Sequence, residues 1–406
     1  MRFLLLLSST ALSTAADGHH HACTRPLGGA TNLRGAPFSP NPAEFGADSS
    51  CCDTAYNRTY PTKAEDAWLA ITMIMTSFSQ LDRFVRMGNY ATWVENVHSP
   101  TVVPVIFYPR AEKWFKVHDG VWQKKAFRAS ACQGEHAQVA GTACTKYVND
   151  KSQLIITCPM DMAVSLLYNG NLQGARAMKL ATFCGRGLFN GEYVVANKWF
   201  TYPMFLEPIL SYFDFWAKFD VDVCFRRPMS YTDVIEPLIK QRAHFFHAKL
   251  IVDNIICENT LGDFMNLYHH AYPCRPWRSE DSPPPWGMWD EPYNHPPVSF
   301  GNFIGGWLGF WQSKRVLHFA KRWWEWKGGW MHRWGDQQYW MPAMWMMNAN
   351  DSVADLHHLR YGLFRHSKDY YPCGGGQTAE ANETSAVFEE WYRQQVREAE
   401  KEKAGR

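Results

Sequence analysis

Residues 213–223, FDFWAKFDVDV, form an apolar stretch that runs into the carboxylates of Asp220 and Asp222. We predict a buried strand here, because aromatic residues fill the stretch and acidic residues end it. On an extended chain, side chains two positions apart share one face, so Asp220 and Asp222 can hold one divalent cation together. An Asp-x-Asp triplet also arises by chance in solvated turns, so its meaning depends on the rest of the chain.

Strand-like and helix-like segments alternate along the chain. Buried strands are predicted for residues 68–74, 102–108 and 154–157, and helices for residues 79–87 and 172–181. This alternation favours an α/β domain: a Rossmann-like, mixed, mostly parallel sheet flanked by helices, which binds ligands at the carboxyl ends of its strands. We expect a single catalytic domain over residues 61–376.

The two ends of the chain are predicted to lie outside this domain. Residues 1–16 have the basic start, short apolar run and small-residue exit of a cleaved signal peptide, with a short membrane anchor as the alternative. Residues 17–60 are predicted to form a weakly ordered stem, and residues 377–406 a charged helix. The leader predicts that the body of the protein lies in a lumen of the secretory pathway, such as the ER lumen, or outside the cell.

Glycosylation motifs and cysteines agree with that compartment. Three Asn-x-Ser/Thr acceptor motifs begin at Asn57, Asn350 and Asn382. The eleven cysteines include no Cys-x-x-Cys pair, which favours disulfides, with Cys132 and Cys144 as the easiest local pair to imagine. The formal net charge of +2 offers no basic surface for phosphate contacts, so no nucleic-acid partner is predicted.

A second motif, HRWGD at residues 332–336, precedes a predicted helix. Asp336 lies at a glycine-containing turn, where it can orient an acceptor hydroxyl or stabilise a positively charged transition state. Arg333 and Trp334 can hold the turn against the sheet. The alternative is that Asp336 caps the helix that follows and contacts no ligand.

A late histidine, His366, is predicted to add a nitrogen ligand to the cation held by Asp220 and Asp222. Carboxylates, an imidazole and diphosphate oxygens together suit Mn²⁺. His357 and His358 are rival candidates, and a surface histidine without a ligand is the other alternative.

Tryptophan is concentrated late in the chain, with nine of the nineteen between Trp307 and Trp345. The flat faces of sugars stack on aromatic rings, so an acceptor groove is one explanation. Core packing is expected to account for most of these rings, and two or three of the nine to touch a ligand.

In this order, the motifs resemble the fungal-type α-1,2-mannosyltransferase family of Golgi enzymes, which use GDP-mannose and Mn²⁺ on a GT-A fold. The family's Tyr-rich strand before Glu-Pro-Asp-Val is similar to residues 212–223, and its Phe-x-x-Asn-Phe segment to residues 300–303. Its Glu-Arg-Trp-Gly-Asp matches residues 332–336 at four of five positions, and its Gly-Tyr-His-His resembles residues 362–366. The resemblance covers roughly residues 67–373.

The resemblance implies a GT-A glycosyltransferase that moves a hexose, mannose in the family, from a nucleotide-diphosphate sugar such as GDP-mannose to a hydroxyl of a glycan or glycoprotein. His332 stands where the family has a glutamate, and it cannot supply a carboxylate. The predicted catalytic residues are Asp336 and His332, the substrate-binding residues Asp220, Asn302, Arg333 and Trp334, and the Mn²⁺ ligands Asp220, Asp222 and His366.

Two alternatives remain open from the sequence. One is another GT-A transferase, such as a galactosyl- or xylosyltransferase, with the same metal site and a different sugar pocket. The other is a secreted, non-catalytic carbohydrate-binding protein whose tryptophan-rich region binds sugar and whose acidic residues are structural.

Overall fold

A computed structural model describes the parts of the chain that contain the sheet and its main helices. The described residues are 48–75, 101–109, 137–139, 141–148, 154–160, 179–180, 189–220, 223–225, 229–251, 261–272, 298–299, 301, 303–326, 334–356 and 364–366. Within this part of the chain, no helix is both long enough and apolar enough to cross a bilayer.

The centre of the described structure is a nine-stranded sheet with the strand order β14-β10-β13-β8-β1-β2-β5-β4-β3. Its strands are β1 (Leu69–Ile74), β2 (Val102–Pro109), β3 (Ala137–Gln138), β4 (Thr145–Val148), β5 (Leu154–Met160), β8 (Phe215–Phe219), β10 (Phe245–His247), β13 (Phe303–Trp307) and β14 (Val353–Asp355). Only β13 and β4 run against the direction of the other strands in this sheet. The predicted mixed, mostly parallel sheet is therefore confirmed.

The predicted strands of the central sheet are confirmed with small shifts at their ends. All six residues of β1 are buried, as expected for a parallel strand covered on both faces. The stretch 213–223 forms β8 and then a second short strand, β9 (Val223–Phe225), which belongs to another ladder. The helix predicted for residues 172–181 is wrong at its end, because Lys179–Leu180 form strand β6. The helix predicted for residues 79–87 lies outside the described residues.

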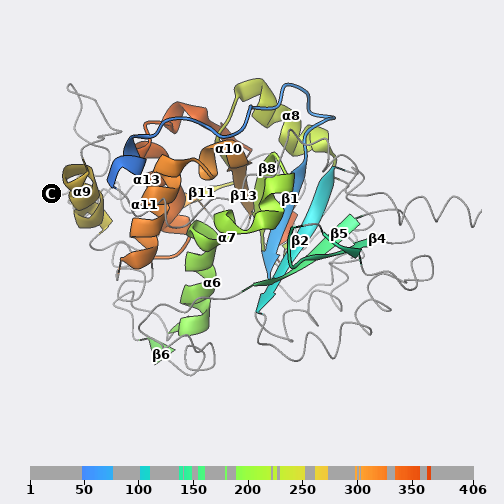
Figure 1. Cartoon of the computed structure of the whole chain (residues 1–406), viewed down its shortest axis with the longest axis horizontal. Coiled ribbons are helices and arrows are strands. Elements are labelled where there is room, and N and C mark those ends of the chain that lie inside the picture. Colours follow the sequence, from blue (N-terminus) through green and yellow to red (C-terminus); the bar gives the residue numbers. More distant parts are fainter. Residues whose placement is uncertain are drawn as a thin grey trace, which may run out of the picture.

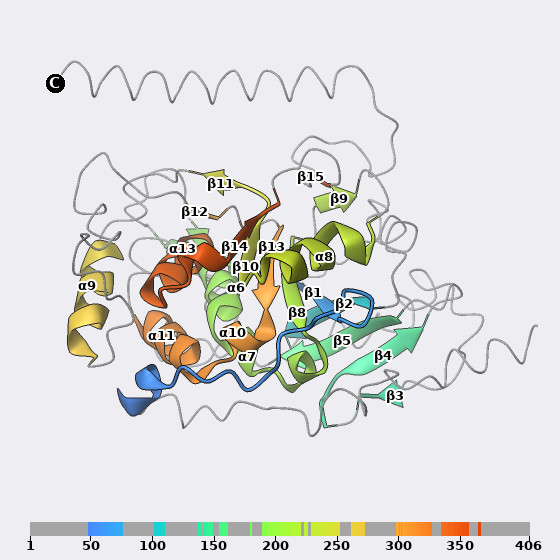
Figure 2. The ribbon, with the colours of Figure 1, turned by 90° about the horizontal axis from the view of Figure 1, so that it is seen from above.

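Most of the helices gather on one side of the molecule, away from the β3, β4 and β5 end of the sheet, whereas α8 lies near β8 and β1 (Figures 1 and 2). The helix α9 lies at the far edge of this group in both views. The helices are α6 (Gly191–Thr201), α7 (Pro203–Leu206), α8 (Tyr231–Gln241), α9 (Leu261–Ala271), α10 (Leu308–Trp311), α11 (Lys314–Glu325) and α13 (Gln337–Met346), with 3-10 turns η2 (Asp48–Cys52), η4 (Pro208–Tyr212) and η7 (Asn350–Ser352).

Tryptophan rings form much of the core between the sheet and these helices. Trp216 of β8 packs against Trp340 of α13 and Trp311 of α10, with ring centroids 5.0 and 6.0 Å away. Five of the nine late tryptophans are buried, namely Trp307, Trp311, Trp323, Trp334 and Trp340. Core packing therefore explains these five, as expected. The part-buried rings of Trp324, Trp326 and Trp345 remain the described candidates for sugar contact.

The N-terminal segment before β1 is packed along the domain, which corrects part of the predicted stem. In both views it runs from beside α11 to β1 (Figures 1 and 2). The Arg58 guanidinium donates to the carbonyls of Phe213 and Leu210 and, at 2.6 Å, to Oε1 of Gln312. The Tyr60 hydroxyl lies 2.8 Å from the Leu238 carbonyl oxygen. Because these side chains satisfy backbone carbonyls at element ends, the ordered domain includes residues 48–60.

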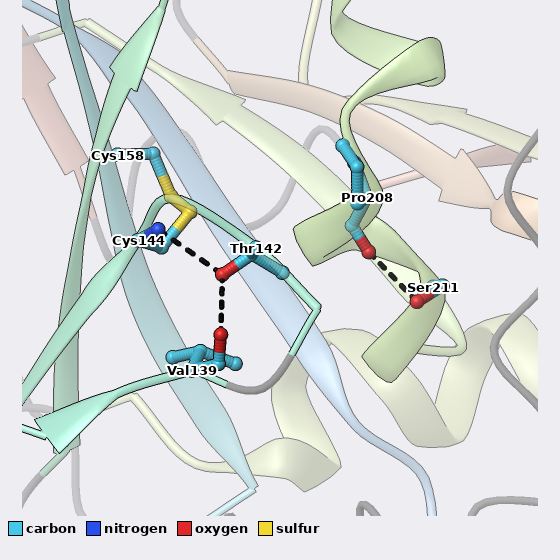
Figure 3. The surroundings of a disulfide bond; sticks show 6 residues. All are labelled: Val139, Thr142, Cys144, Cys158, Pro208 and Ser211. Atoms are coloured by element: carbon cyan, nitrogen blue, oxygen red, sulfur yellow. Dashed lines mark hydrogen bonds between the residues drawn. A yellow bond between two sulfur atoms is a disulfide. The ribbon is translucent and has the colours of Figure 1, made fainter.

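A disulfide joins the outer part of the sheet. Cys144 is bonded to Cys158 of β5, so the predicted pairing of Cys144 with Cys132 is wrong (Figure 3). The Thr142 hydroxyl donates to the Val139 carbonyl and accepts from the Cys144 amide, which fixes the turn before β4. The antiparallel register of β4 on β5, rather than nearness in sequence, selects the partner.

His244, just before β10, is predicted to make stability depend on pH. Its ring stacks on Phe310 and Trp307 at 4.9 and 5.5 Å, and its Nδ1 has no hydrogen-bond partner among the described residues. Burial, and then the charge of Arg315, lower the pKa of His244 from 6.5 to about 4. Between pH 6.5 and 4, His244 is therefore protonated in the unfolded chain but largely neutral in the folded chain. The free energy of unfolding falls as the pH drops through this range.

The expected loss from this one group is up to about 3 kcal/mol of unfolding free energy, and His244→Phe should remove that part of the pH dependence. The measurement is urea unfolding at several pH values across this window. The exposed Leu267 of α9 provides the control, since Leu267→Phe adds the same ring without removing a histidine and should keep the wild-type slope. Equal slopes for His244→Phe and the wild type would refute the assignment.

Candidate active site

The sheet has a topological switch point between β1 and β8. From β1 the chain adds β2 and β5 on one side and then returns to place β8 on the other side. Ligands of open α/β sheets bind outside the carboxyl ends of the strands at such a point. Asp220 follows directly after Phe219, the last residue of β8. The structure therefore places Asp220 where this architecture binds ligands.

A buried lysine connects Asp220 to Asp336. The Lys218 Nζ lies 2.7 Å from Oδ2 of Asp336 and 3.5 Å from Oδ1 of Asp220. Only 5% of the Lys218 side chain and 3% of the Asp336 side chain are exposed, against 36% for Asp220. The Phe200 ring lies 4.9 Å from the same ammonium. Two carboxylates from distant segments thus share one cationic group, with the more exposed one at the strand end.

Asp336 occupies the N-cap position of α13, but its side chain does not cap the helix. No side-chain capping hydrogen bond is formed there, and the carboxylate binds Lys218 instead. The Gln338 side chain ties the turn to the helix, because its Oε1 accepts from the Gly335 amide at 2.9 Å. The capping explanation for Asp336 is therefore wrong in this structure. Its carboxylate belongs to the cluster at the switch point.

Gly301 lies against this ion pair. A Cβ at position 301 would come 3.0 Å from Oδ2 of Asp336 and 3.1 Å from Nζ of Lys218. Contacts this short force the neighbouring atoms to move, so glycine is the residue that leaves the pair undisturbed. The turn before β13 therefore closes one side of the cluster.

Trp334 supports the turn that carries Asp336. Its ring is 1% exposed and stacks on Trp323 of α11, with the ring centroids 5.1 Å apart, while Phe264 of α9 packs edge-on at 5.9 Å. This burial favours the predicted role of holding the turn over direct contact with a sugar. The rigid ring fixes the backbone two residues before Asp336.

A second buried lysine fixes the chain beyond α11. The Lys198 Nζ of α6 donates to the carbonyls of Trp324 and Trp326 at 2.6 and 3.0 Å. Burial lowers the pKa of Lys198 from 10.5 to about 7. The neighbouring Asn197 lies beside Gly335, whose added Cβ would be 3.6 Å from the Asn197 Cβ. Helix α6 thus supports both α11 and the turn before α13.

His366 lies on a strand that reaches the end of the Asp-x-Asp segment. Strand β15 (Phe364–His366) pairs antiparallel with β9, and the Cα partner of His366 is Val223. Val223 directly follows Asp222 in the sequence. Two segments more than a hundred residues apart are therefore joined where the sequence predicts a shared cation.

The remaining predicted site residues lie outside the described part of the chain, and their roles stay predictions. These residues are Asp222, Asn302, His332 and Arg333. The rival histidines 357 and 358 lie there too. Among the residues that the structure describes, no three His, Cys, Asp or Glu side chains converge on one metal position. Asp220 and the His366 strand are the described parts of the predicted metal site.

Sequence reasoning did not assign Lys218 to the site. The available signal was a single basic residue inside a buried strand, two positions before Asp220 and thus on the same face. A buried ammonium needs hydrogen-bond acceptors, so this lysine indicated a polar site beside Asp220, but nothing in the sequence identified Asp336 as its partner.

Solved structures share this fold. Core-mannan synthase A (CmsA/Ktr4) from Aspergillus fumigatus, in its Mn/GDP form, matches with a TM-score of 0.50 and 14% identity over 84% of this chain and 82% of that one. The mannosyltransferase Ktr4p from S. cerevisiae matches with a TM-score of 0.52 and 12% identity over 90% of this chain and 91% of that one. Its GDP complex gives a TM-score of 0.51 over the same shares.

This chain has a GT-A fold. The predicted resemblance to fungal mannosyltransferases is confirmed at the level of three-dimensional structure. No family model matches the sequence, and no curated protein matches it by sequence. In this topology Asp220 follows β8 at the carboxyl ends of the parallel strands, which is where open α/β sheets bind ligands.

Proposed function

We propose that this chain is a metal-dependent glycosyltransferase that moves a hexose from a nucleotide-diphosphate sugar to a hydroxyl of a glycan or glycoprotein. The observation that carries the proposal is the position of Asp220 at the switch point, beside the buried Lys218–Asp336 pair. We propose mannose as the hexose and GDP-mannose as the donor. The fold shared with the mannosyltransferase Ktr4p and with core-mannan synthase A, the latter solved in a Mn/GDP form, supports this choice.

The predicted ligands fit a divalent cation, with Mn²⁺ the proposed one. Carboxylate oxygens from Asp220 and Asp222 and an imidazole nitrogen from His366 form a donor set suited to Mn²⁺. The Asp220 side chain is partly exposed at the strand end, and the His366 strand pairs beside the same segment. When bound, the cation would neutralise the charge that develops on the diphosphate leaving group.

The protein's own groups would orient the reactants. Lys218 holds the Asp336 carboxylate in one place, because a 2.7 Å charge-assisted hydrogen bond restricts its rotation. Asp336 can then accept a hydrogen bond from a sugar or acceptor hydroxyl. We propose His332, Arg333 and Asn302 as further residues around the sugar.

The proposed compartment is the lumen of the secretory pathway. The Cys144–Cys158 disulfide supports this location, since disulfides persist in oxidising compartments. The predicted leader at residues 1–16 supports it independently.

A panel of nucleotide sugars, assayed with the purified chain and Mn²⁺, tests the function. We expect turnover of one donor, GDP-mannose, and loss of that turnover when a chelator removes the metal. Sugar binding without turnover of any donor would instead support a non-catalytic carbohydrate-binding protein. Turnover of another hexose or a pentose donor would keep the reaction class and change the sugar.

Gly301→Ala is expected to reduce turnover while the protein stays folded. The added methyl group must displace the Lys218 and Asp336 side chains, because its contacts would be 3.0 to 3.1 Å. Because a misplacement of about 1 Å can cost about 100-fold in rate, we expect this smaller displacement to lower kcat by up to about tenfold. The control is Gly335→Ala on the neighbouring turn, where the nearest atom would be 3.5 Å away. The prediction fails if both variants have equal kcat and equal thermal stability.

A further inference from the structure

Two of the glycosylation motifs lie within the residues that the structure describes, and the asparagine of each is exposed. Asn57 and Thr59 are both exposed, and Arg58 between them turns inward to bond the Phe213 and Leu210 carbonyls. The motif is thus fixed on the surface by its middle residue. A glycan on Asn57 would extend into solvent without displacing any of the Arg58 hydrogen bonds.

The second motif has a similar environment. Asn350 is exposed in η7, where its Nδ2 lies 3.3 Å from Oδ1 of the exposed Asp351. The third residue, Ser352, uses its backbone carbonyl to accept from the His244 amide at 2.7 Å. Backbone bonding therefore fixes this motif too, and the Asn350 side chain remains at the surface.

Both motifs lie near the amino ends of the parallel strands, at the opposite end of the strands from the candidate active site. Asn57 adjoins Tyr56, whose ring packs on Trp307, the last residue of the antiparallel β13, at 4.9 Å. Asn350 lies just before β14 begins at Val353. These positions mark the amino ends of the parallel strands, whereas Asp220 marks a carboxyl end. Bulky groups at the amino ends of the strands would leave the donor and acceptor positions open.

We propose that Asn57 and Asn350 each carry an N-linked glycan, both on the face opposite the active site. In each case the side-chain amide nitrogen forms a bond to C1 of the first sugar of a lipid-diphosphate-linked oligosaccharide. The bond between that C1 and the diphosphate breaks, the amide loses a proton, and the lipid diphosphate leaves. The host transferase of the ER lumen performs this step on the Asn-x-Ser/Thr motif. The proposal requires lumenal entry and does not depend on the chain's own activity.

Glycopeptide mass spectrometry of the full chain, produced through a eukaryotic secretory pathway, tests both sites. We expect glycans on both asparagines of the wild type. Thr59→Ala should remove the Asn57 glycan and Thr59→Ser should keep it, because serine preserves the motif. In the same way, Ser352→Ala should remove the Asn350 glycan and Ser352→Thr should keep it.

An unmodified Asn57 or Asn350 in a chain that has formed the Cys144–Cys158 disulfide would overturn the proposal for that site. A chain with neither glycans nor disulfide would overturn both sites together with the lumenal location. Nucleotide-sugar turnover is measured on the same samples, and loss of both glycans in Asn57→Gln/Asn350→Gln should leave it unchanged. Full glycosylation without any turnover would support these sites and refute the proposed function alone. Turnover that changes while the fold persists would refute the placement of the glycans away from the active site.

Discussion

Lys218→Met is expected to lower the free energy of unfolding by about 3–5 kcal/mol, because it leaves the Asp336 carboxylate charged and buried without its partner. The two groups are 2.7 Å apart and only 5% and 3% exposed. Methionine keeps most of the lysine side-chain volume, so the loss reports the charge and not a cavity. Chemical unfolding followed by tryptophan fluorescence measures the change.

The double variant Lys218→Met/Asp336→Leu separates stability from function. Replacing both members of a buried ion pair with apolar groups is often neutral, so we expect most of the lost stability to return. Turnover should stay low, since no carboxylate remains at position 336. A double variant that regains turnover would show that the pair is only structural. A Lys218→Met variant as stable as the wild type would refute the buried ion pair.

Asp220→Ala is expected to reduce nucleotide-sugar turnover by about 100- to 1,000-fold with little effect on folding. The residue lies at the end of β8 with 36% of its side chain exposed, so its removal leaves no large cavity. Lys218 retains Asp336 as its closer partner. Steady-state kinetics at saturating donor and Mn²⁺ measure the loss, with circular dichroism to confirm the fold.

The exposed Asp66 provides the matched control, because it precedes the amino end of β1, at the opposite end of the strands from Asp220. Asp66→Ala removes the same charge and should keep wild-type kcat. Equal rates in Asp220→Ala and Asp66→Ala would place the chemistry away from the Asp-x-Asp segment.

Local pattern was enough to predict the central strands. Residues 68–74 and 102–108 are apolar runs, interrupted only by Thr72, and both form parallel strands with ends within two residues of the prediction. The acidic end of β8 was also predictable, because a polar pair after an apolar run marks the end of a strand. These features depend on residues that are neighbours in sequence.

Long-range pairings could not be read in the same way. Lys218 and Asp336 are 118 positions apart, and nothing local to either residue specifies the other. The register that joins Cys144 to Cys158 is set by backbone pairing of two strands, so the nearest cysteine in sequence was the wrong choice. Arg58 illustrates a third case. Its polar surroundings in sequence indicated a stem, whereas its contacts are with carbonyls of the folded domain.

The central claim is that Asp220, Asp222 and His366 hold a divalent cation against a nucleoside diphosphate. Electron paramagnetic resonance of free Mn²⁺ measures cation binding directly, with and without GDP, and needs no turnover. We predict that GDP tightens Mn²⁺ binding to the wild type and that Asp222→Ala and His366→Ala each weaken it at least about tenfold. Mn²⁺ binding that is unchanged in both folded variants would contradict the account.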